Sequence, residues 1–254
     1  MEVIYKIPQE SSAYPEDSAF VIQRIAAIMQ RSIESNQNLI FIRTNLKRGL
    51  PLENINKVAG PFVEAWALEQ FENVADSTNN EFELINAQAG KRLDTFDIVL
   101  QFKRQRDSLQ YLSANVDAKA TAEDIKTSGR SPNITSFARI RTEYIKDPDY
   151  IFIILSLKHK VYGERDVSTG MTNGIMEVVS FAVYDLKYVS SADINYNRAL
   201  GTGQLQIRDI HYVDIVEKRT TWEFIQLLDA KYIQSKGEDA WLALARKFAW
   251  VKED

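Results

Sequence analysis

The chain has 254 residues, of which 45% are hydrophobic and 26% are charged, so it can bury the core of an ordinary globular protein. It contains no cysteine, which excludes a disulfide framework, metal centres held by thiolates and a cysteine nucleophile. The formal net charge of −4 does not exclude a nucleic-acid-binding protein, because such a protein needs a basic cleft rather than a basic surface.

The N-terminal third of the chain predicts two helices and a strand. Residues 1–17 lack the pattern of a secretory signal, and no apolar run is long enough to span a bilayer, so we expect a cytoplasmic protein. Apolar spacing predicts helices over 17–35 and 54–74, with a strand over 39–44 between them. The Gly60-Pro61 pair is expected to break or kink the second helix. The predicted buried face of that helix consists of Ile55, Val58, Phe62, Trp66 and Phe71.

The middle of the chain predicts a hairpin, a helix and a central strand. Strand-like runs over 96–102 and 109–121 with a short charged connection favour an antiparallel hairpin. Ser131 is a candidate N-cap with Pro132 at the first helical position. The continuous apolar run over 150–159 is typical of a strand covered on both faces. The predicted buried face of the helix consists of Ile134, Phe137, Ile140 or Arg141, and Tyr144.

The remainder of the chain predicts two strands over 179–189 and 204–216, followed by two helices. The first of these helices starts at Thr220 or Thr221, and the second spans 238–251. This order indicates an α/β fold in which helices flank one central mixed β-sheet. We expect a single domain over 1–254, made of N-terminal helices (1–90), a core (91–216) and C-terminal helices (217–254).

Three chemically useful side chains converge in the predicted hairpin. Asp97 lies at the start of the first strand, and Asp117 and Lys119 lie near the end of the second. Residues i and i+2 of a strand share a face, so Asp117 and Lys119 project together, and pairing can bring Asp97 beside them. Mg²⁺ prefers oxygen ligands, and a lysine beside the metal can position or deprotonate water or stabilise transition-state charge. The set therefore fits phosphodiester hydrolysis.

The Asp-x-Lys tripeptide alone is weak evidence, because it can equally form a solvent-facing ion pair on an edge strand. Its position on a strand paired with that of Asp97 strengthens the catalytic interpretation. Glu64 is a further candidate acid beside the metal. The alternative is that Glu64 belongs to a solvated helix face together with Glu69 and Glu72.

Two polar segments are candidates for DNA contact. Arginine can recognise guanine and asparagine can recognise adenine in the major groove. The alternatives are a solvated loop over 124–133 and a tight turn within 195–206. The candidate DNA-binding residues are Lys126, Ser128, Gly129, Arg130, Ser131, Asn133, Asn195, Asn197, Arg198, Thr202 and Gln204.

The motif and several longer stretches resemble a known family. Asp97, followed along the chain by Asp117-Ala118-Lys119, matches the PD-(D/E)xK nuclease motif, with Phe96 at the variable position where proline is usual. The longer stretches lie between about residues 43 and 222 and are similar to type II restriction endonucleases of this superfamily. They are TNLKRGLPLENINKVAGP, NVDAKAT, GRSPNITSFARIRTEYIKDP, FIILSLKH, ALGTGQLQIRDIHYV and KRTTW.

The resemblance implies a restriction-endonuclease-like fold and a homodimer, because a two-fold enzyme matches a palindromic target. It implies that Asp97 and Asp117 bind Mg²⁺, that Lys119 is the catalytic lysine, and that Glu64 lies near the site. It further implies double-stranded DNA as substrate, GTTAAC as target, and a blunt cut. Asn133 and its neighbours would contact DNA, and a methyltransferase would be expected in the same system.

Two other readings of the same residues stay open. A repair or recombination nuclease with this core would cut DNA without a defined site. A non-catalytic DNA-binding relative is disfavoured, because Asp97, Asp117 and Lys119 are all present.

Overall fold

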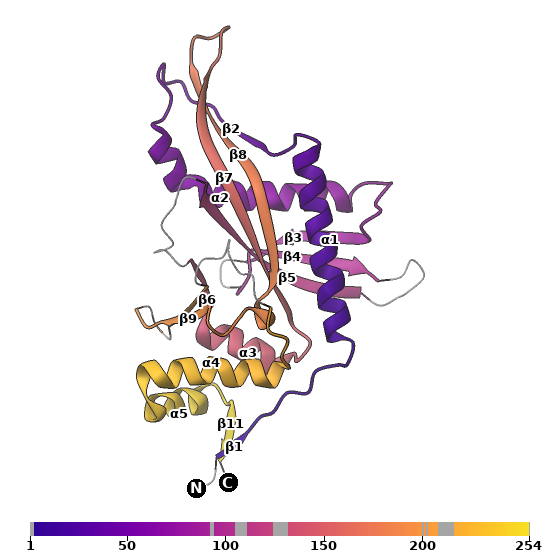
Figure 1. Ribbon diagram of the computed structural model, residues 1–254, viewed down its shortest axis with the longest axis vertical. Coiled ribbons are helices and arrows are strands. Elements are labelled where there is room, and N and C mark those ends of the chain that lie inside the picture. Colours follow the sequence, from indigo (N-terminus) through magenta and orange to yellow (C-terminus); the bar gives the residue numbers. More distant parts are fainter. Residues whose placement is uncertain are drawn as a thin grey trace.

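The structure is a computed structural model that describes residues 3–91, 94–104, 111–123, 132–199, 201, 203–207 and 216–253. Strands run through the middle of the molecule, α1 lies along one side, and α4 and α5 lie together at the end that carries both chain termini (Figure 1). The elements are β1 (Val3–Tyr5), α1 (Tyr14–Glu34), β2 (Leu39–Ile42), α2 (Leu52–Ala75), β3 (Leu84–Ala89), β4 (Ile98–Lys103), β5 (Tyr111–Ala122), β6 (Asn133–Ser136), α3 (Phe137–Lys146), β7 (Ile151–Arg165), β8 (Thr172–Asp185), η1 (Leu186–Tyr188), β9 (Ile194–Asn197), β10 (Gln204–Ile207), α4 (Thr221–Lys236), α5 (Glu238–Lys247) and β11 (Val251–Glu253).

The central sheet has six strands in the order β2-β8-β7-β5-β4-β3. Strands β5 and β7 are parallel, whereas the other neighbours are antiparallel. This confirms the predicted α/β class with a mixed central sheet. The expectation of a single sheet was wrong, because β6, β10 and β9 form a three-stranded sheet and β1 pairs with β11.

Strand β7 separates two hydrophobic cores. Ile151, Ile153 and Leu155 pack into the core built with α1 and α2. Phe152 and Ile154, which point to the opposite face, pack into the core built with α3, α4 and α5. The alternation follows from the two-residue repeat of a strand. It explains the uninterrupted apolar run that predicted a strand covered on both faces.

The predicted helix start near Ser131 and Pro132 was wrong. Residues 133–136 form strand β6, and α3 begins only at Phe137. Strand β6 pairs antiparallel with β10, a long-range partner that a local Ser-Pro capping pattern cannot reveal. Ile134 is buried as predicted, but as a strand residue.

Helix α2 is continuous through Pro61, so the pair with Gly60 does not break it. Val58 and Phe62, predicted to be buried, are 44% and 42% exposed. The core instead takes the neighbouring positions Ala59 and Val63. Apolar residues occupy both faces of this part of α2, so periodicity alone selected the wrong one.

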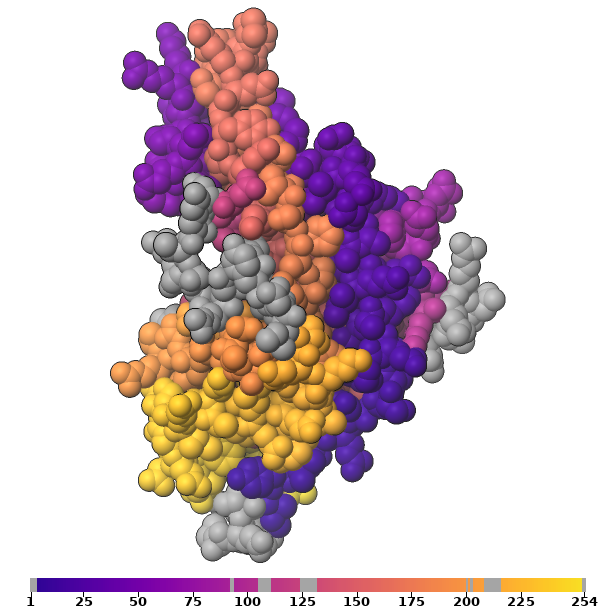
Figure 2. All heavy atoms as spheres, viewed as in Figure 1, coloured from indigo at the N-terminus to yellow at the C-terminus, as the bar shows by residue number. Residues whose placement is uncertain are grey.

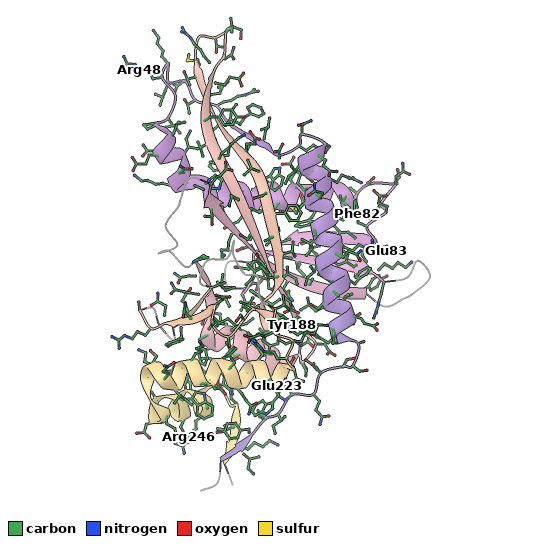
Figure 3. The ribbon with its side chains drawn as sticks, in the orientation of Figure 1. Arg48, Phe82, Glu83, Tyr188, Glu223 and Arg246 are labelled. Atoms are coloured by element: carbon green, nitrogen blue, oxygen red, sulfur yellow. The ribbon has the colours of Figure 1, made fainter. Side chains whose placement is uncertain are left out.

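In the C-terminal part of the chain, the helices were predicted more accurately than the strands. Thr220 caps α4 through a capping box with Glu223, which Figure 3 labels at the start of this helix. The strand expected over 204–216 ends at Ile207, and residues 208–215 lie outside the described part. Strand β9 was not anticipated. Within the described ranges, no helix is long and apolar enough to cross a membrane.

Candidate active site

Asp97 is held against β5 by main-chain hydrogen bonds. Its own N–H donates to the carbonyl of Val116 at 2.9 Å, and the N–H of Ala118 donates to its Oδ2, also at 2.9 Å. Ile98 faces Val116 in the antiparallel register of β4 and β5. The hairpin therefore places the first carboxylate beside the strand that carries Asp117.

Asp117 and Lys119 share the face of β5 that points away from the α1–α2 core, since Ala114 and Val116 point into that core. The Nζ of Lys119 donates to Oδ1 of Asp117 at 2.8 Å and lies 3.7 Å from Oδ2 of Asp97. The side chain of Asp117 is only 4% exposed, against 33% for Asp97. The structure thus brings two carboxylates and one ammonium group together, with one carboxylate deeply buried.

Burial and mutual charge perturb these groups. Burial raises the pKa of Asp117 well above its usual value, although the charge of Lys119 opposes the shift. Burial lowers the pKa of Lys119, but the carboxylates of Asp117 and Asp97 together outweigh it, so this pKa is raised. Without a metal ion, the lysine is therefore held in its charged form.

Glu64 lies on α2 and is half-buried. Burial raises its pKa first, the charge of Asp97 raises it further, and the charge of Lys119 lowers it. Glu64 is therefore in electrostatic reach of the cluster. It does not line the cavity described below.

The cluster fits a hard divalent cation. Oδ2 of Asp117 is buried and has no hydrogen-bond partner within the described residues. A buried carboxylate oxygen without a donor is costly, and a cation would compensate it. The described ranges contain no group of three or more acids or histidines arranged for a metal. Two carboxylates with open space are nevertheless sufficient for Mg²⁺, which keeps waters and takes phosphate oxygens as further ligands.

A cavity of about 610 Å³ opens directly over the cluster. Its walls come from the loop before β4, from β5, from β6 and the first turn of α3, and from the turn before β10. Besides the catalytic candidates, its polar lining includes Asp94, Thr95, Thr135, Ser136, Arg139 and Gln204. The cavity therefore joins the acidic cluster to the three-stranded sheet.

The three-stranded sheet presents a row of amide side chains. Gln206 on the middle strand β10 is paired in register with Asn133 of β6 and with Asn195 of β9. Gln204, two residues earlier on the same face, is paired with Asn197. The intervening Leu205 is fully buried, so the opposite face of the sheet packs into the α3–α5 core.

Two hydrogen bonds orient these amides. Nε2 of Gln206 donates to Oδ1 of Asn133 at 2.9 Å. Oδ1 of Asn197 accepts from the N–H of Ala199 at 3.0 Å and so shapes the turn after β9. In that turn Gly201 and Gly203 adopt positive φ angles of 52° and 87°, which favour glycine. Because Asn197 pairs with Gln204, the described residues of this connection lie next to the amide row, and Arg198 among them is exposed.

Sequence reasoning missed one residue of this site. Gln206 was overlooked, although the alternation of polar and apolar residues in Gln-Leu-Gln-Ile places it on the face of Gln204. Arg139 on α3, a basic residue whose type in the sequence already suggested a phosphate contact, lines the cavity and is exposed. The candidates Lys126, Ser128, Gly129, Arg130, Ser131 and Thr202 lie outside the described residues.

Comparison with known proteins identifies the family. The family model described as "Type II restriction endonuclease HpaI" matches residues 1–249. The type II restriction enzyme HpaI of Haemophilus parainfluenzae is 54% identical over 227 residues, which cover 89% of this chain and 88% of that protein. The solved NlaIV restriction endonuclease is 15% identical with a TM-score of 0.49, covering 87% of this chain and 85% of its own, a likeness too distant to bear on activity. The chain therefore belongs to the HpaI family of type II restriction endonucleases.

Proposed function

We propose that this endonuclease hydrolyses double-stranded DNA at the palindrome GTTAAC, leaving blunt ends, in a reaction that requires Mg²⁺. The target and the blunt cut rest on the family resemblance and on the 54% identity to HpaI. The observation that carries the catalytic part is the buried Oδ2 of Asp117, which has no hydrogen-bond partner among the described residues and lies beside Asp97 and Lys119 on the floor of the cavity.

In this proposal Asp97 and Asp117 hold the cation. A bound Mg²⁺ would supply charge stabilisation to the phosphate that is being cleaved. The hydrogen bond from Ala118 N–H to Oδ2 of Asp97 keeps this carboxylate turned towards β5. Glu64 adds negative charge from α2, through water or a second ion.

Lys119 acts on the attacking water or on the phosphate. Its Nζ is held by both carboxylates, so its position is set before substrate binds. Once these carboxylates are shared with a cation, Lys119 loses part of the interaction that raises its pKa. Its Nζ can then hold a proton towards a phosphate oxygen or accept one from the attacking water.

The amide row is the proposed base-reading surface. Asparagine and glutamine can form paired hydrogen bonds with adenine in the major groove. Asn133, Asn195, Asn197 and Gln204 were candidates from sequence, and we add Gln206, because it fixes the side chain of Asn133. Lys126, Ser128, Gly129, Arg130, Ser131, Arg198 and Thr202 remain candidates for contacts with the backbone or bases.

A palindromic target and one catalytic cluster in each chain favour a homodimer, in which each subunit cuts one strand. A methyltransferase that protects the same sequence is expected in the host, whether or not it binds the endonuclease.

Plasmid cleavage tests the proposal. Purified protein would be incubated with a plasmid of known sequence and Mg²⁺, beside an EDTA control and Lys119→Ala, and the fragment ends would be sequenced. We expect discrete fragments ending in GTT and AAC that both controls abolish. Discrete ends at another palindrome would refute the target, and a smear would favour a nuclease without sequence specificity. Absence of cleavage with Mg²⁺ or Mn²⁺ would refute catalysis.

A further inference from the structure

Helix α2 has a second apolar face, and no described residue of the chain covers it. Val58, Pro61, Phe62 and Ala65 follow the spacing i, i+3, i+4, i+7 and are all exposed. We call these four residues the α2 outer stripe. Ile55, Ala59, Val63 and Trp66 already bury the other face in the core. A helix that is apolar on two faces is expected to be buried on both.

The exposed apolar surface extends from the stripe into the segment that precedes α2. Leu46 and Leu52 are 47% and 46% exposed, so four large exposed apolar side chains lie within 46–62. Such a concentration marks an interaction surface more often than a chance exposure. The segment lies against the outer ends of β7 and β8, where the Thr172 hydroxyl donates to the carbonyl of Lys47 at 3.3 Å. These parts project from one end of the molecule (Figure 2).

Basic and acidic residues lie at opposite ends of this exposed surface. The segment before α2 carries exposed Arg43, Lys47 and Arg48 and no acid, and Figure 3 places Arg48 at the projecting end. The C-terminal half of α2 continues the outer stripe with exposed Glu69 and Glu72 and has no basic residue in its last turn. Acids at a helix C-terminus oppose the helix dipole, so a partner's cations there would be stabilising.

We propose that the α2 outer stripe is the surface on which a second copy of this chain docks, with the two α2 helices antiparallel about a two-fold axis near Pro61 and Phe62. In this arrangement Val58 lies against Ala65 of the partner subunit. The basic segment before one α2 lies near the acidic end of the other. A two-fold contact must be self-complementary, and the order basic, apolar, acidic along one helix meets this condition. DNA is disfavoured as the occupant, because the centre of this surface is apolar and its far end carries the exposed acids Glu69 and Glu72.

The proposal rests on the homodimer proposed above and specifies its interface. A stable dimer buries roughly 1,200–2,000 Å² in total, so the stripe is the centre of the contact and the 46–52 segment extends it. Because α2 also carries Glu64, the same helix would join the interface to the catalytic cluster of each subunit.

Sedimentation velocity on the full chain tests the interface. Phe62→Glu should reduce the mass from that of two chains to 29.1 kDa. Ile85→Glu on β3 is the matched control, since Ile85 is 41% exposed outside the stripe, and it should stay dimeric. Circular dichroism would show that both variants fold.

Disulfide cross-linking gives a second measurement that does not depend on the charged variant folding. The chain has no cysteine, so Phe62→Cys would carry the only thiol. Mild oxidation should link it into a covalent dimer, whereas Ile85→Cys should remain a monomer on a non-reducing gel. The proposed interface would be overturned if wild type is dimeric, Phe62→Glu is also dimeric and Phe62→Cys forms no cross-link. That result would leave the homodimer itself intact. A monomeric wild type that cuts both strands would overturn the homodimer itself.

Discussion

Two Asp-x-Lys tripeptides of this molecule, one at Asp117 and one at Asp185, both have a buried aspartate but differ in which side-chain atoms are left without a partner. Asp117 and Lys119 lie on the floor of an open cavity, where Lys119 bonds one oxygen of Asp117 and the other oxygen has no partner in the described structure. Asp185 and Lys187 lie at the end of β8, between the N-terminal segment and α4. The second pair has the same sequence pattern but no open position.

Every polar atom of the second pair is used. Oδ2 of Asp185 accepts from the hydroxyls of Tyr14 at 2.9 Å and Ser18 at 2.6 Å, and Oδ1 accepts from the N–H of Lys187 at 2.9 Å. The Nζ of Lys187 donates to Glu10 at 2.5 Å and lies 3.0 Å from the ring centroid of Tyr14. Tyr188, labelled in Figure 3, marks this junction. The pair therefore ties the N-terminal segment to the sheet.

The comparison shows that catalytic potential lies in the unsatisfied oxygen rather than in the tripeptide. A saturated carboxylate stabilises the fold, whereas a buried carboxylate oxygen without a donor is a site that a cation or substrate can complete. A further Asp-x-Lys tripeptide within the described residues begins at Asp229 on α4, where Asp229 accepts from Arg141 through both carboxylate oxygens. That carboxylate is likewise saturated.

The largest expected effect separates the two pairs by activity. Asp117→Asn should lower the rate of plasmid cleavage by roughly 10³-fold or more, because it removes charge from the cation site. Asp185→Asn should keep most of the activity of each folded molecule, because its carboxylate lies outside the cavity. Initial rates at saturating Mg²⁺, normalised to the folded fraction, would measure both. Equal losses in the two variants would abolish the distinction.

For the free energy of unfolding, we expect the opposite order of effects at Asp117 and Asp185. Asp185→Ala leaves the donors of Tyr14, Ser18 and Lys187 without their acceptor, so we expect the free energy of unfolding to fall by about 2–4 kcal/mol. Asp117→Asn should cost little or stabilise the metal-free protein, since it removes a buried charge with an unpaired oxygen. Urea unfolding in EDTA would compare the variants. A larger loss for Asp117→Asn than for Asp185→Ala would contradict this account.

The pH dependence of stability should carry the signature of Asp117. Its folded pKa is raised, so the folded state retains a proton that the unfolded state releases, and stability is lost as pH rises from the unfolded towards the folded pKa. The Asp117→Asn variant has no titrating group at this position, so it does not show this loss of stability. In EDTA, the Tm of the variant relative to wild type should therefore increase as pH rises above the ordinary pKa of an aspartate. A difference in Tm that is constant or falls with pH would show that Asp117 is not destabilised by burial.

The smallest expected effect concerns base recognition. Gln206→Ala should reduce discrimination between GTTAAC and single-base variants by about 1–2 kcal/mol, because it frees the side chain of Asn133. Asn133→Ala should have a similar effect, and the double variant should lose less than the sum. Cleavage rates on matched oligonucleotide duplexes would measure this. Additive losses would show that the Gln206–Asn133 bond does not act in recognition.

Much of the fold followed from local pattern. The hairpin of β4 and β5, the buried strand β7 and the cap at Thr220 were predicted correctly, because alternation, apolar runs and capping chemistry are local signals. The start of α3 was not, since pairing of β6 with β10 overrode a helix-like Ser-Pro sequence. The single domain stays a prediction.

The candidate site was predictable only in part. The spacing in the hairpin indicated that Asp97, Asp117 and Lys119 would meet, and the structure brings them together. The partnership of Gln206 with Asn133 was not predictable, because it depends on the register between two strands that are distant in sequence. The exposure of Val58 and Phe62 was also hidden, because a periodic pattern does not say which chain covers a face.

Direct measurement of cation binding tests the central claim most sharply. Mn²⁺ would be titrated calorimetrically into wild type, Asp117→Asn and Asp185→Asn in the presence of a duplex that carries GTTAAC and a non-hydrolysable central phosphate. We expect wild type and Asp185→Asn to bind the ion alike and Asp117→Asn to lose binding. Binding by Asp117→Asn as tight as that of wild type would contradict the assignment of the open oxygen of Asp117 as the cation site.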